Sequence, residues 1–175
     1  MFVIDLSCYL TTPVKIVFVV IADGETREMK RSEIEVYTDG SALNNPGPGG
    51  WAFCYRHDDG HSPTSTTGYS ERNDHDVIVK GASKNTTNNR MELQAVIECL
   101  KWIHDVPLVI HSDSRLTIKC AQGEWKRKAN QDLWSEYDRV SLNRDVRFVW
   151  VKAHSGIKYN EIADKAARSE AERIR

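Results

Sequence analysis

The chain has 175 residues, a length that suits one domain of ordinary size with a short appendage. Hydrophobic residues make up 40% of the sequence and charged residues 28%, enough for a packed core beneath a polar surface. The formal net charge of −1 excludes a globally basic protein that coats nucleic acid, although a local basic patch can still bind it. The four cysteines include no C-x-x-C pair, which excludes zinc-finger spacing, and we expect Cys54 and Cys99 as reduced thiols in the core.

Residues 1–33 are predicted to be an extension of unknown role that precedes the main domain at residues 34–175. The β-branched run 14–22 predicts a strand in this extension. Three roles stay open for it: an extra strand at the edge of the sheet, a strand that binds a partner, or the product of a wrongly placed start codon. Because no apolar run is long enough to span a membrane and the N-terminus lacks a basic signal-peptide start, we expect a cytoplasmic protein without a membrane partner. We also expect it to be monomeric.

The main domain opens with a predicted hairpin. Residues 34–40 alternate as a strand does, the Gly/Pro-rich segment 44–50 predicts a turn, and residues 51–55 predict the second strand. The polar stretch 56–76 is predicted to be a surface loop, and a third strand is expected to begin at residues 77–79.

Helices and strands alternate in the second half. Apolar residues at helical spacing predict a helix over 90–100, preceded by Asn88 and Asn89, which can cap it. The elements expected after it are a strand at 108–110, helices at 116–121 and 133–140, a strand at 146–151 and an amphipathic helix at 160–175. This order predicts an α/β fold with a mixed five-stranded sheet, its first three strands antiparallel, and helices on both faces.

Four acidic residues stand at the ends of these elements. Asp39 is on the first strand, Glu92 in the first turns of the first long helix, Asp113 after a buried strand and Asp164 on the last helix. Residues at strand ends and helix termini can converge on one crevice of an α/β sheet. Clustered carboxylates need balancing cations, and oxygen ligands suit Mg²⁺ or Mn²⁺. Any one of these acids alone is more often a solvated surface charge.

Four sequence motifs place these acids in a recognisable order. The motifs are Tyr37-Thr38-Asp39-Gly40-Ser41 with residues 45–51; Thr86-Thr87-Asn88-Asn89-Arg90-Met91-Glu92-Leu93; His111-Ser112-Asp113-Ser114; and residues 151–156 with Asn160-Glu161-Ile162-Ala163-Asp164. From about Ile34 to the C-terminus, the chain resembles the type 1 ribonuclease H family. The resemblance implies the ribonuclease H-like fold.

The resemblance also implies a chemistry. Asp39, Glu92, Asp113 and Asp164 match the carboxylates that hold two Mg²⁺ ions, for which Mn²⁺ can substitute. His154 matches a loop histidine that assists turnover as part of the catalytic set; its side chain titrates near neutrality and can move protons or help product leave. The expected activity is endonucleolytic hydrolysis of the RNA strand of RNA–DNA hybrids, leaving 3′-hydroxyl and 5′-phosphate ends.

Asparagines are the expected readers of the RNA strand. An enzyme that cuts RNA only when it is paired with DNA must sense 2′-hydroxyl groups, which donate and accept hydrogen bonds. Amide side chains can answer both functions, and Asn45, Asn88 and Asn89 match the family positions that do so. Alternatively, Asn88 and Asn89 serve to cap the helix, a role compatible with recognition.

The DNA strand has its own expected contacts. Thr87 and Asn130 match a pocket for a DNA phosphate, but Asn85 stands where the family often has an arginine, which weakens that pocket.

A long basic protrusion found in some members is compressed here to residues 123–130, called the basic segment below. In it Lys126, Arg127 and Lys128 are expected to contact phosphates, with Trp125 against a DNA sugar. A solvated turn is the alternative.

Two other functions compete with this prediction. One is a DNA-cutting integrase, transposase or junction resolvase, against which the asparagine pair and the loop around His154 argue. The other is a catalytically silent module that binds hybrid or RNA, which predicts the loss of at least one carboxylate, and none is lost here.

Overall fold

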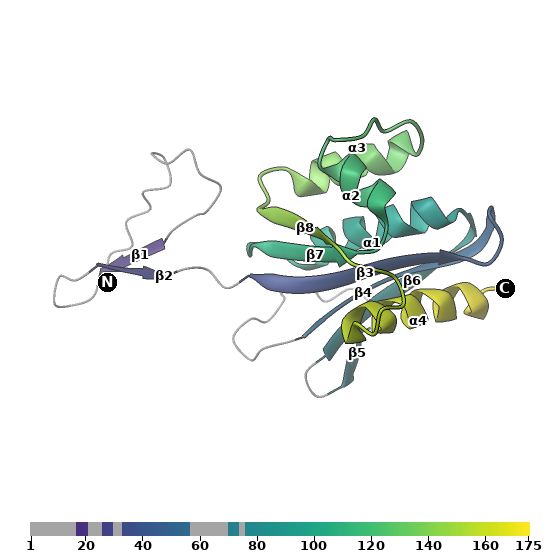
Figure 1. Ribbon diagram of the computed structural model, residues 1–175, viewed down its shortest axis with the longest axis horizontal. Helices are drawn as coiled ribbons and strands as arrows, with labels where there is room; N and C mark the ends of the chain where they lie inside the picture. The colour runs from purple at the N-terminus through teal and green to yellow at the C-terminus, as the bar shows by residue number, and fades with distance from the viewer. Residues whose placement is uncertain (1–16, 21–25, 30–32, 57–69, 74–75) are drawn as a thin grey trace.

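A computed structural model describes residues 17–20, 26–29, 33–56, 70–73 and 76–175. Within these residues a mixed sheet is covered by helices on both faces (Figure 1). Its strands are β3 (Ile34–Ala42), β4 (Gly47–Arg56), β5 (Ser70–Asn73), β6 (Asp76–Thr86), β7 (Leu108–Ser112) and β8 (Val146–Trp150). The helices are α1 (Asn88–Trp102), α2 (Arg115–Ala121), α3 (Gln131–Ser141) and α4 (Lys158–Arg173).

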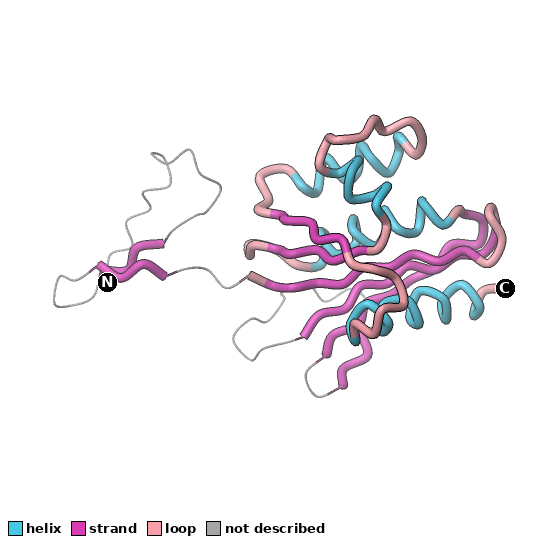
Figure 2. Tube along the Cα trace, viewed as in Figure 1, coloured by secondary structure: helices cyan, strands magenta, loops and turns pink. Residues whose placement is uncertain are grey.

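The strand order across the sheet is β5-β6-β4-β3-β7-β8. β3, β4 and β6 are antiparallel neighbours, β7 runs parallel to β3, and β8 runs parallel to β7. Helices α1, α2 and α3 lie on one side of the sheet and α4 on the other (Figure 2). The predicted mixed sheet, its three antiparallel first strands and its two helical layers are therefore confirmed.

The main core lies between α1 and the sheet. Val36 and Phe53 from the strands meet Leu93 and Ile97 from the helix, and all four side chains are buried. Burying a side chain of this size contributes about 1.5–3 kcal/mol. This layer fixes α1 against β3, which matters for the site described below.

Three cysteines of the described chain are buried and free of disulfides. Cys54 and Cys99 lie in the interior as predicted, and Cys120 is buried as well. Burial raises the pKa of the Cys54 and Cys99 thiols to about 12, so both stay protonated and unreactive.

The predicted turn at residues 44–50 was wrong in its second half, because β4 already begins at Gly47. Glycines in this stretch allow close packing where a side chain would collide. A Cβ atom at Gly50 would overlap the backbone oxygen of Ala167, so α4 rests directly on the strand. The composition that predicts a turn here serves helix-to-sheet contact instead.

The predicted loop at residues 56–76 contains the short edge strand β5, which pairs with β6 from Ser70↔Val79 to Asn73↔Asp76. Its polar sequence shows no hydrophobic alternation, and backbone pairing at a sheet edge needs none. The other residues of that loop, 57–69 and 74–75, lie outside the described residues.

The extension contributes a separate two-stranded sheet. β1 (Val17–Val20) falls within the strand predicted at residues 14–22 and pairs antiparallel with β2 (Thr26–Met29). Within the described ranges these two strands pair only with each other and do not extend the main sheet. Cys8 and the remaining residues of the extension lie outside the described residues.

Candidate active site

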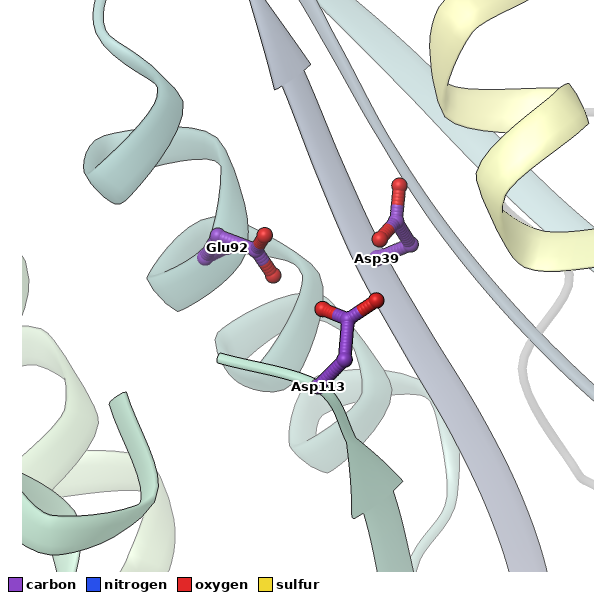
Figure 3. Close-up of side chains that lie close together, drawn as sticks. All are labelled: Asp39, Glu92 and Asp113. Atoms are coloured by element: carbon purple, nitrogen blue, oxygen red, sulfur yellow. The ribbon is translucent and has the colours of Figure 1, made fainter. Parts of the chain in front are cut away.

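Three acidic side chains converge beside the middle of the sheet. One carboxylate oxygen each of Asp39, Glu92 and Asp113 lies within 4.8 Å of the others, and the three residues are called the carboxylate cluster below. They come from β3, from α1 and from the residue that follows β7, and their side chains point toward one another (Figure 3). The sequence-based prediction named four acids, of which the structure brings these three within that distance.

Strand pairing and a glycine bring the cluster together. β3 and β7 are parallel neighbours with Tyr37 opposite His111, so Asp39 and Asp113, each two residues further on, come side by side. A Cβ atom at position 40 would overlap the backbone nitrogen of Glu92. Because Gly40 has no side chain, the first turns of α1 can approach β3 closely enough to deliver the Glu92 carboxylate.

The cluster is electrostatically unbalanced without a cation. Burial, followed by the negative charges of Asp113 and Asp164, raises the pKa of Asp39 to about 8. Burial and the neighbouring carboxylates raise the pKa of Glu92 well above its usual value, and burial raises that of Asp113. Such shifts mean that the charged forms are unfavourable until positive charge arrives.

The donor set of the cluster fits a hard divalent cation. Oε2 of Glu92 is buried and has no hydrogen-bond partner, although a buried polar atom normally has one. The ligand atoms offered are all carboxylate oxygens, which suit Mg²⁺ or Mn²⁺ rather than a soft metal. A divalent cation would supply the missing partner of Glu92 and the missing positive charge together.

Asp164 and His154 lie at the border of the cluster. The charge of Asp164 contributes to raising the pKa of both Asp39 and Asp113, so its carboxylate is close to theirs. Nδ1 of His154 is 3.7 Å from Oδ2 of Asp164, and the His154 side chain is 77% exposed. The histidine stands in the loop between β8 and α4. It can therefore reach solvent and the site alike.

Two of the predicted asparagines are linked to the cluster by hydrogen bonds. Oδ1 of Asn45 accepts from the backbone N–H of Asn88 over 3.1 Å. Nδ2 of Asn88 donates to Oε1 of Glu92 over 3.5 Å. Asn89, the third predicted reader, is exposed beside them at the start of α1. The amides thus stand at the edge of the cluster.

The prediction that Asn88 or Asn89 caps α1 was wrong, because the cap is Thr87. Its side chain accepts a hydrogen bond from the backbone N–H of Arg90 over 3.4 Å. A threonine hydroxyl in extended backbone suits this geometry, and with Thr87 as the cap neither asparagine side chain is needed for capping.

Arg90 joins the two members of the predicted phosphate pocket. Besides its backbone bond to Thr87, its Nη1 donates to Oδ1 of Asn130 over 3.3 Å and to Oδ1 of Asp132 over 2.9 Å. Hydrogen bonding from Arg90 lowers the pKa of Asp132 to about 2. The pocket residues lie together, but the guanidinium between them is paired with a carboxylate of the same chain.

The basic segment forms one wall of a pocket of about 490 Å³. Its lining includes Trp125, Lys126, Lys128 and Asn130 of the segment together with Asn89 of α1. Trp125 is 50% exposed, as a contact surface requires. The structure therefore brings most of the predicted substrate-binding residues to one hollow beside the N-terminus of α1.

Arg127 also lines the pocket, but its guanidinium has partners within the fold, and its expected phosphate contact stays a prediction. Its guanidinium lies over the ring of Trp134 at 4.4 Å and bonds the Asp138 carboxylate and the Cys120 carbonyl. These contacts hold the basic segment against α2 and α3, whereas Lys126 and Lys128 form no ion pair with any residue that the structure describes.

Comparison with known proteins identifies the family to which the chain belongs. A family model described as RNase H matches residues 31–172. The chain belongs to the ribonuclease H family. It is 40% identical over 151 residues to a ribonuclease HI of Campylobacter jejuni, a match that covers 81% of this chain and 92% of that protein.

Solved structures agree with this membership. LC9-RNase H1, a type 1 RNase H with the type 2 active-site motif, shares 29% identity at a TM-score of 0.63, covering 85% of this chain and 76% of that one. LC11-RNase H1, solved in complex with an RNA/DNA hybrid, shares 21% identity at a TM-score of 0.57, covering 78% and 97%, and supports the fold alone. The predicted likeness to type 1 ribonuclease H is confirmed.

Asn160 is a residue of this ribonuclease H site whose contact the sequence analysis missed. It is buried on α4, its side chain hydrogen-bonds Asp113, and its Oδ1 has no partner. The sequence held a signal, because Asn160 precedes Asp164 by four residues and so shares its helix face. Separately, none of the helices in the described residues is long and apolar enough to cross a membrane.

Proposed function

We propose that this ribonuclease H family member is an endonuclease that hydrolyses the RNA strand of RNA–DNA hybrids with two Mg²⁺ ions. Asp39, Glu92, Asp113 and Asp164 are the proposed ligands, and the proposed products carry 3′-hydroxyl and 5′-phosphate ends. The observation that carries the proposal is the carboxylate cluster, with Oε2 of Glu92 buried and unpartnered beside two more acids.

The chemistry that two divalent ions supply at such a site is activation of a water molecule and stabilisation of the leaving oxygen of an in-line displacement. The protein's own contribution is to hold the ligand oxygens rigidly. Asp39 is fixed by the sheet, Glu92 by the close approach of α1 to Gly40, and Asp113 by Asn160. This preorganisation keeps the charged groups in place before substrate arrives.

His154 is proposed to move protons or to help the product leave. It is exposed in a loop, lies 3.7 Å from the Asp164 carboxylate, and carries an imidazole ring that can both accept and donate a proton. A group that shuttles protons needs both access to solvent and proximity to the site, and this position offers both.

Selectivity for the hybrid is proposed to come from the amides around Glu92. Asn88 already donates to Glu92, and Asn45 supports the Asn88 backbone, so a 2′-hydroxyl bound by these amides is placed at a fixed position relative to the cluster. Asn89 and Asn130, which line the pocket beside the basic segment, are proposed to extend the contact, with Thr87 at the DNA phosphate.

The proposed ribonuclease H domain is residues 34–175, with residues 1–33 as an extension. The family match over residues 31–172 supports these bounds. Mg²⁺ as the physiological ion, a monomeric state and a cytoplasmic location stay predictions from the sequence.

The decisive experiment compares four labelled substrates: the hybrid, single-stranded RNA, double-stranded RNA and double-stranded DNA. Each is incubated with Mg²⁺, Mn²⁺ or EDTA, and the product ends are mapped by polymerase extension and by ligation. We expect cleavage of the hybrid RNA strand with either metal ion and none in EDTA.

Two results would contradict the proposal. Cutting of double-stranded DNA would favour the integrase-like alternative. Tight binding of the hybrid without any cleavage in either metal would favour the silent binding module.

A further inference from the structure

Arg115 is an exposed cation placed next to the carboxylate cluster. It is the first residue of α2 and follows Asp113 by two residues. Its Cζ lies 4.2 Å from the centre of the Trp150 ring. No carboxylate in the part of the chain that the structure describes forms an ion pair with it.

This state sets Arg115 apart from the other arginines near the site. Arg90 is paired with Asp132, and Arg127 is paired with Asp138. Further along the chain, ion pairs join Arg139 to Glu136, Arg147 to Glu33, Arg168 to Glu172 and Arg173 to Glu170. Arg115 is held by an aromatic ring instead, so its charge is not neutralised from within the protein.

Trp150 connects this arginine to the cluster. It is the last residue of β8, lies opposite Ser112 in the parallel register, and is 44% exposed. Its Nε1–H donates to the backbone oxygen of Asp113 over 3.1 Å. One indole ring therefore holds the backbone of a cluster residue and carries the guanidinium of Arg115 on its face.

We propose that Arg115, held on Trp150, binds a backbone phosphate of the RNA strand next to the phosphate that is cleaved. The proposal rests on the proposed function, because it names a substrate contact of that same site. It makes Arg115 a substrate-positioning residue and Trp150 the residue that orients it.

The chemistry of the guanidinium favours this assignment. Contact with an aromatic ring leaves the N–H donors of arginine unused, and two of these donors can bind a phosphate group in a bidentate geometry. Holding the side chain on the ring also reduces the conformational freedom that binding would otherwise remove. A cation at this position offsets the repulsion that a phosphate meets near three carboxylates.

The first experiment measures binding without cleavage. Arg115→Gln and Arg115→Lys are made in an Asp39→Asn background, and the affinity for a hybrid is measured at several KCl concentrations. We expect Arg115→Gln to lose about tenfold in affinity. The slope of log K against log salt concentration should fall by about 0.7–0.9, the signature of one lost phosphate contact.

The matched variants separate this role from a structural one. Arg115→Lys should keep the salt slope, because the charge remains, while losing part of the affinity. Arg139→Gln is the control, since Arg139 lies near the end of α3, which leads to the start of β8, whereas Trp150 is at the end of that strand. An unchanged affinity and slope in Arg115→Gln, with the same Tm, overturn the proposal.

A second experiment identifies the phosphate. Neutral methylphosphonate linkages, each beside a 2′-O-methyl nucleotide that keeps the linkage stable, are placed singly along the RNA strand. In the background protein, neutralising the phosphate next to the cleavage site should weaken binding, and in Arg115→Gln the same change should have no further effect. A full additional loss in Arg115→Gln at that position overturns the assignment.

Cleavage kinetics distinguish failure of this proposal from failure of the proposed function. With Asp39 restored, Arg115→Gln should raise KM for the hybrid about tenfold with a smaller change in kcat. Trp150→Phe keeps an aromatic face and should preserve KM better than Trp150→Leu. An unchanged KM in Arg115→Gln overturns the Arg115 contact while the nuclease stands, whereas a wild-type protein that binds hybrid but never cuts it overturns the nuclease.

Discussion

The carboxylate cluster and the basic segment both concentrate charge, and they differ in how much of it the protein neutralises. The cluster has three acids within reach of one another, and an oxygen of Glu92 is left without a partner. In the basic segment Arg127 is paired with Asp138 and lies over Trp134. The carboxylate cluster is rigid and its negative charge is not balanced within the protein. In the basic segment, by contrast, the charge of Arg127 is paired within the fold and stabilises the segment.

The difference teaches that a count of charged residues does not measure a binding surface. Arg127 looked from the sequence like a phosphate contact, yet it holds the segment against α2 and α3. Asp39 looked like any surface acid when taken alone, yet it is buried with a strongly raised pKa. Whether a charge is paired within the fold decides whether it can act on a ligand.

Removing a cluster acid should have the largest effect. We expect Asp39→Asn to reduce hybrid cleavage by on the order of a thousandfold or more, because a metal ligand is lost. The same change should raise the Tm of the metal-free protein at pH 7, because the wild type must take up a proton or bury a charge at Asp39 on folding and the amide avoids both. Cleavage assays and thermal melts test both, with Asp145→Asn, just before the start of β8, as the control; normal cleavage by Asp39→Asn would contradict the assignment.

Metal-free stability should fall as pH rises from about 4 to about 8. In the unfolded chain the pKa of Asp39 is near its ordinary value of 3.8, whereas in the folded protein it is about 8. Between these values the folded state holds more protons, so deprotonation favours unfolding. Adding Mg²⁺ should reverse the trend and raise the Tm by on the order of 5 °C at pH 7.5. A flat pH profile in EDTA would refute the account of the cluster.

Asn88→Ala tests the edge of the cluster. The amide of Asn88 contacts Glu92 and is the proposed reader of a 2′-hydroxyl. We expect its loss to reduce the preference for hybrid over double-stranded DNA by about tenfold, the value of one or two hydrogen bonds. Competition binding measures this preference, and Gln122→Ala, a change in an exposed residue after α2, serves as the control. An unaltered preference would remove Asn88 from recognition.

Two variants in the basic segment should affect different properties, one the stability of the fold and the other the binding of the hybrid. We expect Arg127→Ala to lower the free energy of unfolding by about 1–2 kcal/mol, because it loses the contact with Trp134 and the bonds to Asp138 and Cys120. Lys128→Ala should leave unfolding unchanged but weaken hybrid binding about two- to threefold and reduce its salt slope by about 0.7–0.9. Chemical denaturation measures the stability of both variants, and salt-dependent binding measures their affinity for the hybrid. If the two variants changed stability and affinity alike, the separate roles of Arg127 and Lys128 would be contradicted.

Much of the fold could be predicted because its signals are local. Alternation in residues 34–40 and helical spacing in residues 90–100 reflect burial on one face, which the sequence records directly. The edge strand β5 escaped prediction because its pairing is made by the backbone. The start of β4 was missed because Gly49 and Gly50 indicate a turn as readily as a close approach to another element.

The sequence predicted which residues form the site better than it predicted how they are arranged in space. The motifs around Asp39, Glu92 and Asp113 named the cluster, but no sequence pattern says how near Asp164 comes. The contact of Asn160 with Asp113 and the pairing of Arg127 depend on side chains brought together by the sheet and α3. Contacts of this kind appear only when the elements are placed in space.

The contact between Gly50 and α4 has a consequence for which substitutions the enzyme can accept. α4 rests on β4 at Ala167, and Asp164 lies three residues earlier, about 4.5 Å along the helix axis. Adding one methyl group at position 50 would force the helix away from the sheet and move Asp164 with it. A loss of activity can thus originate at a residue that touches neither metal nor substrate, and random mutagenesis should find Gly50 as intolerant as the acids themselves.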